Sequence, residues 1–163
     1  MTPRIAIDPA TLDDVPLIVQ LIRELAEYEK LSHEVSVTEE QLRSALFGAR
    51  PVAEAVIASG DDVPVGFALF FANYSTFLGR PGLYLEDLFV RPEARGLGIG
   101  RALLAYLARL TVEREWGRLE WRVLDWNEPS IAFYKKLGAE PLSDWTVFRV
   151  TGSSLRELGK AKS

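Results

Sequence analysis

Two adjacent carboxylates, Glu86 and Asp87, stand in the middle of the apolar stretch LYLEDLFV at 83–90. A buried strand is normally almost wholly apolar, so two charges in its middle are unusual. If the stretch is a strand, side-chain alternation places Glu86 with Tyr84 and Leu88 on one face and Asp87 on the other. Such a carboxylate either acts as a base and holds a cation, or belongs to an ion pair or an exposed strand end. The sequence alone leaves both interpretations open.

The next segment, VRPEARGLGIGRALL at 90–104, has three glycines that alternate with apolar residues, and a helical pattern follows them. The spacing of Gly96, Gly98 and Gly100 is not that of a Rossmann fingerprint, and the Lys-Ser/Thr pair of a Walker loop is missing. Glycines let a backbone approach an anion closely, and the unpaired N–H groups at a helix start attract negative charge. The segment is therefore either an anion site, to which Arg95 adds a positive charge, or a flexible turn.

A third candidate is the segment NEPSIAFYKKLG at 127–138, which has a helical pattern. At about 100° per residue, Asn127, Ser130 and Tyr134 fall within one narrow arc, so one face carries an amide, a hydroxyl and a phenol. A phenol has a pKa near 10 and can donate a proton to a leaving group. The alternative is a core tyrosine whose hydroxyl is hydrogen-bonded.

Periodicity predicts the elements that position these residues. Two capping boxes, Thr11 with Asp14 and Thr38 with Gln41, mark helix starts. The order of the elements predicts an α/β fold with a mixed, mostly antiparallel central sheet and helices on both faces, in a single domain over residues 1–163. Strands are expected at 4–7, 52–58, 63–74, 83–90, 118–124 and 145–150, helices at 10–30, 39–47, 98–116 and 127–138, and a short helix or frayed end at 152–163.

Composition excludes several classes of protein. The chain has 163 residues, no cysteine and one histidine, His33, which excludes disulfides, a cysteine acyl intermediate and a His-rich metal site. The net charge is −4 and no basic stripe is visible, so a nucleic-acid partner is not expected. No apolar run approaches the roughly 18 residues of a membrane helix, and no signal peptide is evident. We therefore expect a cytoplasmic protein with no metal, membrane or nucleic-acid partner.

The stretch RGLGIG, together with the preceding YLEDLFV, strongly resembles the acetyl-CoA-binding motif of the GCN5-related N-acetyltransferases. In that family, backbone amides of an Arg-x-x-Gly-x-Gly motif hold the coenzyme A pyrophosphate. The stretches LIRELAEYEKL and LDWNEPSIAFYKKLGA are similar to the diamine (spermidine/spermine) and thialysine acetyltransferase branch, and the resemblance extends over most of the chain. It implies that the pyrophosphate is held by Arg95, Gly96, Leu97, Gly98, Ile99, Gly100 and Arg101.

The resemblance also implies a reaction: acetyl-CoA, without a metal, donates its acetyl group to a primary amine of a small molecule by direct attack in a ternary complex. The amine would be a polyamine, a diamine or a lysine-like amino acid such as thialysine, and the enzyme would be a homodimer. Two alternatives remain. One is a regulatory module that senses acetyl-CoA without turning it over, and the other is an acetyltransferase that acts on proteins or peptides.

The same resemblance gives individual residues their roles. It implies that Tyr134 is the general acid and that Glu86 contacts the substrate, which adds to its candidacy as a base. It implies that the strand carrying Leu88, Phe89 and Val90 pairs with the pantetheine arm, and that a bulge splays this strand from its neighbour. Further coenzyme contacts are expected at Asn127, Glu128, Pro129 and Ser130, and substrate contacts at Tyr28, Glu29, Glu86, Asp87, Glu120, Trp121 and Arg122.

The chain also departs from the polyamine pattern. Arg122 is a poor neighbour for a polycation and suggests a substrate with a carboxylate, such as an amino acid. The loop from Gly138 to Trp145 is shorter than in the spermidine enzymes and lacks an acidic residue that they use, unless Asp144 replaces it. These departures leave the transfer chemistry intact but put polyamine specificity in doubt.

Overall fold

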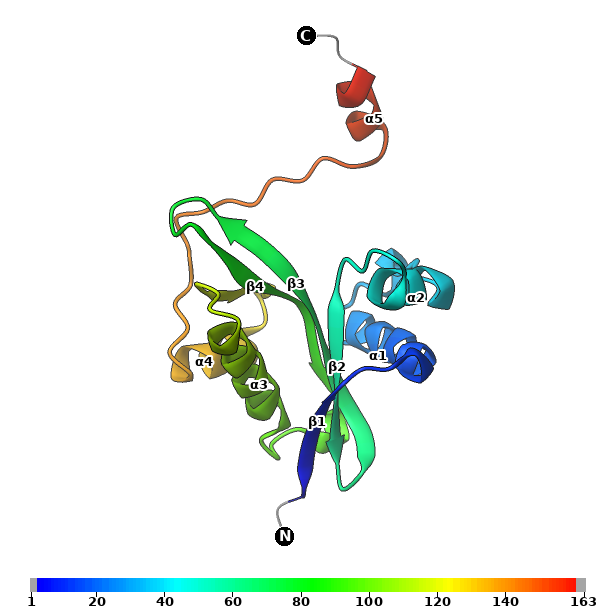
Figure 1. Ribbon diagram of the computed structural model, residues 1–163, viewed down its shortest axis with the longest axis vertical. Helices are drawn as coiled ribbons and strands as arrows, with labels where there is room; N and C mark the ends of the chain where they lie inside the picture. Colours follow the sequence, from blue (N-terminus) through cyan, green and yellow to red (C-terminus); the bar gives the residue numbers. More distant parts are fainter. Residues whose placement is uncertain (1–2, 161–163) are drawn as a thin grey trace. The chain divides into compact units, whose positions relative to one another are not determined.

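Five strands pair in sequence order into one sheet (Figure 1). The first four strands are antiparallel to one another, and the fifth is parallel to the fourth. The computed structural model describes residues 3–160, which divide into one unit up to Leu124 and a second from Asp125. The strands are β1 (Ile5–Pro9), β2 (Glu54–Gly60), β3 (Val63–Ser75), β4 (Arg80–Val90) and β5 (Leu119–Trp121). This sheet confirms the predicted α/β class.

Helices cover both faces of the sheet, as predicted (Figure 1). One face is covered by α1 (Val15–Tyr28) and α2 (Glu39–Phe47), and the other by α3 (Ile99–Glu113), which connects β4 to β5. The predicted capping boxes of the first unit are present at Thr11 and Thr38. Three 3₁₀ turns, η1 (Leu12–Asp14), η2 (Ser32–Glu34) and η3 (Pro92–Ala94), link these elements.

A hydrophobic core lies between the sheet and the helices α1 and α2, and it holds the end of β4 that carries Phe89. The apolar residues of α1 recur every three or four positions and so fall on one buried stripe. Burial of each large side chain contributes roughly 1.5–3 kcal/mol. The cluster comprises Val15, Ile18, Val19, Leu21, Leu25, Leu42, Leu46, Ala55, Ile57, Phe67, Leu69 and Phe89.

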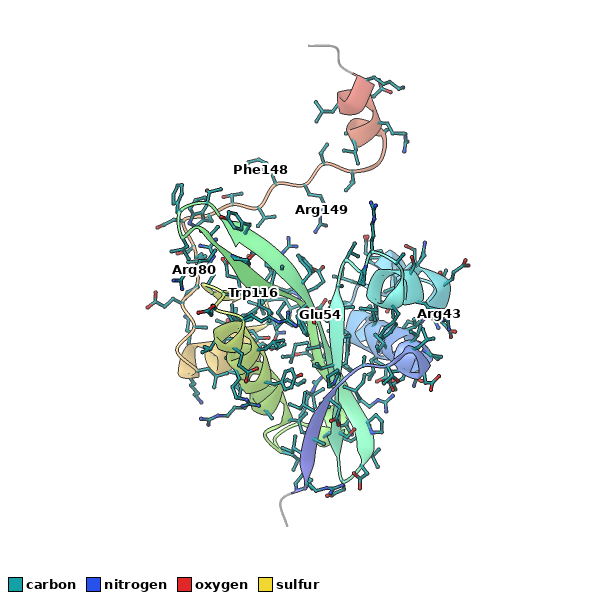
Figure 2. The ribbon with its side chains drawn as sticks, in the orientation of Figure 1. Arg43, Glu54, Arg80, Trp116, Phe148 and Arg149 are labelled. Atoms are coloured by element: carbon teal, nitrogen blue, oxygen red, sulfur yellow. The ribbon has the colours of Figure 1, made fainter. Side chains whose placement is uncertain are left out.

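Two predicted strands differ from the structure. The strand expected at 118–124 is limited to Leu119–Trp121, because β5 pairs with only a short part of β4. The strand expected at 145–150 is wrong: this segment of the second unit is extended but has no strand assignment, with Trp145 77% and Phe148 92% exposed. Figure 2 shows Phe148 and Arg149 on opposite sides of it. Its β-branched and aromatic residues favour a strand, but a strand also requires a partner edge, and the described part of this unit supplies none.

The second unit, taken by itself, contains α4 (Glu128–Lys136) and α5 (Gly152–Lys160). Asn127 begins α4 as predicted, since its side-chain Oδ1 accepts a hydrogen bond from the Ser130 N–H at 3.4 Å. Gly138, with φ of 90°, follows the end of the helix, a conformation that favours glycine. The helix α5 agrees with the prediction for 152–163, of which residues 161–163 lie outside the described residues.

Candidate active site

A β-bulge interrupts β4 at Glu86. Leu69 of β3 lies opposite Asp87, and the next residue, Phe70, lies opposite Leu85, so Glu86 has no cross-strand partner in β3. An inserted residue of this kind bends the strand and redirects the side chains around it. The bulge that the family resemblance implied is therefore present, and one of the candidate carboxylates occupies it.

The bulge reverses the alternation of side chains in β4. Phe71 and Leu69, two residues apart in β3, share a face, and they lie opposite Tyr84 and Asp87 respectively. Tyr84 and Asp87 therefore lie on one face of the sheet, the face covered by α1 and α2. The prediction that Asp87 faces away from Tyr84 is wrong, because regular alternation does not allow for the extra residue at Glu86.

Asp87 is the most strongly perturbed carboxylate of this region. Burial raises the pKa of Asp87 to about 7, and the negative charges of Glu86 and Glu29 add to the effect. Glu29 follows the last residue of α1, and burial raises its pKa as well. The structure thus brings together three acidic side chains predicted to contact substrate, and Asp87 is only half-ionised near neutral pH. Glu86 itself is exposed.

Beyond the bulge, the edge of β4 that faces away from β3 has no strand partner among residues 3–160, and the Val90 carbonyl on this edge accepts a hydrogen bond from the Arg95 Nε. β5 pairs with β4 only along Leu83–Leu85. The Arg91 N–H donates to the Val65 carbonyl of β3 at 2.8 Å, so the backbone groups of Leu88 and Val90 face away from β3 by alternation. This edge suits pairing with an extended ligand that carries amide groups.

The glycine loop has the conformation of an anion cradle. Gly96 and Gly98 have φ of 77° and 86°, in the left-handed region that favours glycine, and no atom lies within 4 Å of where a Cβ would be added at either position. The loop leads directly into α3 at Ile99, whose first N–H groups have no partner within the helix. The predicted residues from Gly96 to Arg101 therefore form a loop and helix start that can receive a diphosphate.

Arg95 does not lie over this loop. Its Nε donates to the Val90 carbonyl at 2.9 Å, and its guanidinium lies 4.5 Å from the centre of the Tyr28 ring and 5.7 Å from that of Phe89. β4 and the end of α1 therefore hold this side chain, and the role of its charge at the glycine loop stays a prediction. Phe89, predicted to contact the cofactor, packs its side chain into the core.

The three predicted substrate residues around β5 have different environments. Glu120 lies beside Tyr84 in the parallel register and pairs with Arg118 at 2.7 Å. Trp121 is half-buried. Arg122 donates from Nε to the Tyr84 hydroxyl at 2.6 Å, a contact that the sequence did not reveal.

An ion pair between Glu24 and Arg91 also escaped the sequence analysis. The Arg91 guanidinium donates to both carboxylate oxygens of Glu24 at 2.9 Å, and also to the Pro64 carbonyl at 3.2 Å. The hydrogen bond from Arg91 lowers the pKa of Glu24. The pair ties α1 to the residue at which β4 turns into the glycine loop, and a separation of 67 residues leaves no local signal for it.

The remaining predicted residues belong to the second unit. Asn127, Glu128, Pro129 and Ser130 form the cap and first turn of α4. Asn127 is buried, with 6% of its surface exposed. Tyr134 lies on the same helix, half-buried, with its ring centre 5.6 Å from that of Phe133.

Comparison with known proteins identifies the class. Residues 18–139 match the model of the Acetyltransferase (GNAT) family. Thialysine N-epsilon-acetyltransferase of Bos taurus is 43% identical over 152 residues, covering 86% of this chain and 89% of that protein. L-ornithine N5-acetyltransferase of Arabidopsis thaliana is 33% identical, covering 93% and 86%. A solved integron cassette protein from V. cholerae has a TM-score of 0.80 at 26% identity over 99% of both chains. The chain therefore belongs to the GNAT family.

Within that family, the chain is an acetyl-CoA-dependent N-acetyltransferase of the thialysine and diamine branch. Across residues 3–160, no helix combines the length and apolarity needed to cross a membrane. The same residues contain no group of three or more His, Cys, Asp or Glu side chains placed to hold a metal ion.

Proposed function

We propose that the enzyme acetylates the primary amine of a small molecule: a diamine, a polyamine or a lysine-like amino acid such as thialysine. The observation that carries this proposal is the grouping of Glu29, Glu86 and Asp87 at the bulge, next to the edge of β4 that has no strand partner in the described chain. The names of the relatives, which include acetyltransferases for thialysine and for L-ornithine, support a small amine of this kind.

The carboxylates match the charge of the substrate. An alkyl amine has a pKa near 10.4, so it arrives as an ammonium ion at neutral pH. Glu29 and Asp87 attract that cation. The positive charge of the cation offsets the energetic cost of keeping each partly buried carboxylate ionised. Glu86, exposed on the bulge, accepts a proton from the ammonium, directly or through water, so that the nitrogen lone pair becomes available.

The backbone around the bulge orients the acetyl donor. Acetyl-CoA supplies a thioester-bound acetyl group, and the residues present fit its diphosphate and its amide-containing arm. We assign the diphosphate to the N–H groups from Gly96 to Arg101, and the arm to the edge at Leu88 and Val90. The Leu88 N–H is the donor that we assign to the thioester carbonyl, where negative charge develops. Asn127 to Ser130 add contacts from α4.

The proposed step balances with one acid and one base. A bond forms between the amine nitrogen and the carbonyl carbon, and the carbon–sulfur bond breaks. The ammonium gives one proton to Glu86 before the attack, and the departing sulfur takes a proton from the Tyr134 phenol. The nitrogen then loses its second proton to the Tyr134 phenolate, directly or through water, which restores the phenol. Direct attack in a ternary complex requires no acyl-enzyme, in keeping with the absence of cysteine from the sequence.

The alternative functions receive less support. A non-catalytic sensor of acetyl-CoA needs the glycine loop but not a carboxylate cluster beside it. A protein or peptide acetyltransferase shares the chemistry, but the relatives at 43% and 33% identity are named for small amino-acid substrates.

Release of coenzyme thiol from acetyl-CoA, measured with a panel of amines, tests the proposal. We expect release with small diamines or lysine-like amino acids and none with peptides that carry an N-terminal amine. Tyr134→Phe is expected to lower kcat at least 10-fold while leaving the acetyl-CoA dissociation constant within about 2-fold, because the phenol acts only as the proton donor. Binding of acetyl-CoA without release for every amine would support the sensor instead.

The roles of Glu86 and Tyr134 are tested separately. Glu86→Gln should alter the pH–rate profile, since the base is removed. An unaltered profile would exclude Glu86 as the base, and unchanged turnover in Tyr134→Phe would exclude Tyr134 as the acid.

We further propose that the enzyme is a cytoplasmic homodimer. The extended segment at 145–150 exposes Trp145, Val147, Phe148 and Val150, and an apolar strand-like segment of this kind suits pairing with a second copy. Light scattering coupled to size-exclusion chromatography tests the oligomeric state: a mass near twice 18.2 kDa is expected, and a mass near 18.2 kDa would refute the dimer.

A further inference from the structure

Arg122 is a cation whose side chain is held by a tyrosine rather than by a carboxylate. Its Nε donates to the Tyr84 hydroxyl at 2.6 Å, and its guanidinium carbon lies 5.8 Å from the centre of the Tyr84 ring. Its two terminal amino groups make no further hydrogen bond or ion pair among residues 3–160, and the residue is exposed. An arginine held at one nitrogen presents the rest of its planar fork to a ligand.

The nearest carboxylate on β5 is already satisfied. Glu120 pairs with Arg118 at 2.7 Å and accepts from the Asn73 amide at 3.5 Å. Glu120 is therefore occupied by Arg118, and Arg122 has no carboxylate partner of its own among the described residues of the first unit. A fork of this kind binds a carboxylate through two parallel hydrogen bonds.

The backbone positions of Asp87 and of Tyr84, which holds this cation, give an approximate length for a substrate. The residue that holds it, Tyr84, shares a face of the sheet with Asp87, and the bulged Glu86 lies between them. Three residues of strand span at most roughly 10 Å, and a bulge shortens that distance. Three backbone bonds span roughly 3.5 Å, so the six bonds from the carboxylate carbon to the side-chain nitrogen of lysine span about 7 Å. The length of an extended lysine, about 7 Å from carboxylate carbon to side-chain nitrogen, is compatible with the strand distance between Tyr84 and Asp87.

We infer that Arg122, positioned by Tyr84, binds the α-carboxylate of an amino-acid substrate whose side-chain amine lies at Glu29, Glu86 and Asp87. This inference rests on the proposed function and narrows its substrate class. The same guanidinium repels the second ammonium of a diamine at this place. The site thus selects a lysine-like amino acid over the corresponding diamine by attraction of one group and repulsion of the other.

Two matched pairs of substrates isolate the carboxylate: lysine with cadaverine, and ornithine with putrescine. Each diamine is its amino acid without the carboxylate, so the ratio of kcat/KM within a pair measures recognition of that group alone. We expect the wild-type enzyme to favour the amino acid at least 10-fold. In Arg122→Gln, kcat/KM for the amino acid should fall about 10–100-fold, mainly through KM, as expected for a lost charged hydrogen bond. The value for the diamine should stay within about 2-fold or rise.

Two further variants separate recognition from general damage. Tyr84→Phe removes only the hydroxyl that positions Arg122, so it should lower the same ratio by a smaller factor. Arg109→Gln removes an equal charge from an exposed site on α3, across the sheet, and should leave the ratio unchanged.

The outcomes distinguish the two proposals. A ratio that Arg122→Gln leaves within 2-fold of wild type would overturn the role of Arg122 while leaving acetylation of small amines intact. A wild-type preference for the diamines would overturn it as well. Turnover of none of the four compounds, nor of any other small amine, would instead overturn the proposed function itself.

Discussion

The side chains of Tyr84 and Asp87 lie on the same face of the sheet, although the two residues are three positions apart in β4. Regular alternation would place them on opposite faces, and the bulge at Glu86 brings them together. One consequence is that Asp87 is half-buried on the face that carries the apolar core, where its pKa rises to about 7. A second is that Asp87 shares this face with Tyr84, whose hydroxyl accepts a hydrogen bond from the Arg122 Nε.

The pKa of Asp87 predicts the acidic limb of the pH profile. Asp87 must be ionised to hold an ammonium ion, so kcat/KM for the amine should rise with pH through about 7, the pKa of the free enzyme. Asp87→Asn should lower kcat/KM by about 10–100-fold and remove this limb, while KM for acetyl-CoA stays unchanged. Steady-state rates between pH 5.5 and 9 measure both effects. If the acidic limb of the pH profile persisted in Asp87→Asn, another group would titrate there. Asp13→Asn, in an exposed turn, is the control for the loss of one negative charge.

The same raised pKa predicts a cost in stability. Folding raises the pKa of Asp87 from its ordinary value of 3.8 to about 7, so the folded state binds the proton more tightly than the unfolded state. The folded protein therefore loses stability as pH rises from about 4 to about 7, by up to about 4 kcal/mol for this group. Asp87→Asn should raise the free energy of unfolding by roughly 1–4 kcal/mol at pH 8 and leave it little changed at pH 4. Urea unfolding at the two pH values measures it, and equal effects at both would contradict the burial of an ionised Asp87.

Gly98 predicts a selective loss of cofactor binding. Its φ of 86° is strained for any residue with a Cβ, and the Cβ of alanine would enter the open space of the loop. Gly98→Ala should raise KM for acetyl-CoA about 10-fold or more while changing KM for the amine less than 2-fold. Gly79→Ala is the matched control, because Gly79 has φ of 64° and equally open surroundings in the turn between β3 and β4. Equal effects of the two variants would mean that backbone strain, not the anion cradle, explains the loss.

Local signals in the sequence predicted the elements well and their long-range details poorly. The capping residues Thr38 and Asn127 act on neighbours three residues away, so their patterns predict helix starts correctly. The faces of Tyr84 and Asp87 depend on a register shift against β3, which no pattern within β4 records. Contacts such as Tyr84 with Arg122 likewise join residues 38 positions apart, and only the pairing of strands brings them together.

The segment at 145–150 shows that a local signal can also predict an element that the structure does not contain. Its β-branched and aromatic residues are typical of a strand, yet Phe148 is 92% exposed in the described chain (Figure 2). Such a composition indicates that a segment is suited to a sheet, but it does not specify the strand with which the segment pairs.

The ion pair between Glu24 and Arg91 predicts a coupling between stability and cofactor binding. Arg91 lies where β4 enters the glycine loop, and its bidentate contact holds that point to α1. Glu24→Gln should lower the free energy of unfolding by about 1 kcal/mol at pH 7. The hydrogen bond from Arg91 lowers the pKa of Glu24, so its contribution is present above pH 4.5 and is lost as pH falls further. Urea unfolding at pH 7 and pH 3 checks the sign.

A second bidentate pair gives the control for this coupling. Arg114 donates to both carboxylate oxygens of Glu54 at 2.7 Å, and it joins the end of α3 to β2, away from the glycine loop (Figure 2 labels Glu54). Glu54→Gln should destabilise the protein by a similar amount, about 1 kcal/mol, without changing KM for acetyl-CoA. Glu24→Gln should raise that KM about 2–5-fold, because the entry to the loop is no longer fixed and part of the binding energy is used to order it. If both variants changed KM equally, general destabilisation would account for the effect and the pair at Glu24 would have no special part in holding the loop.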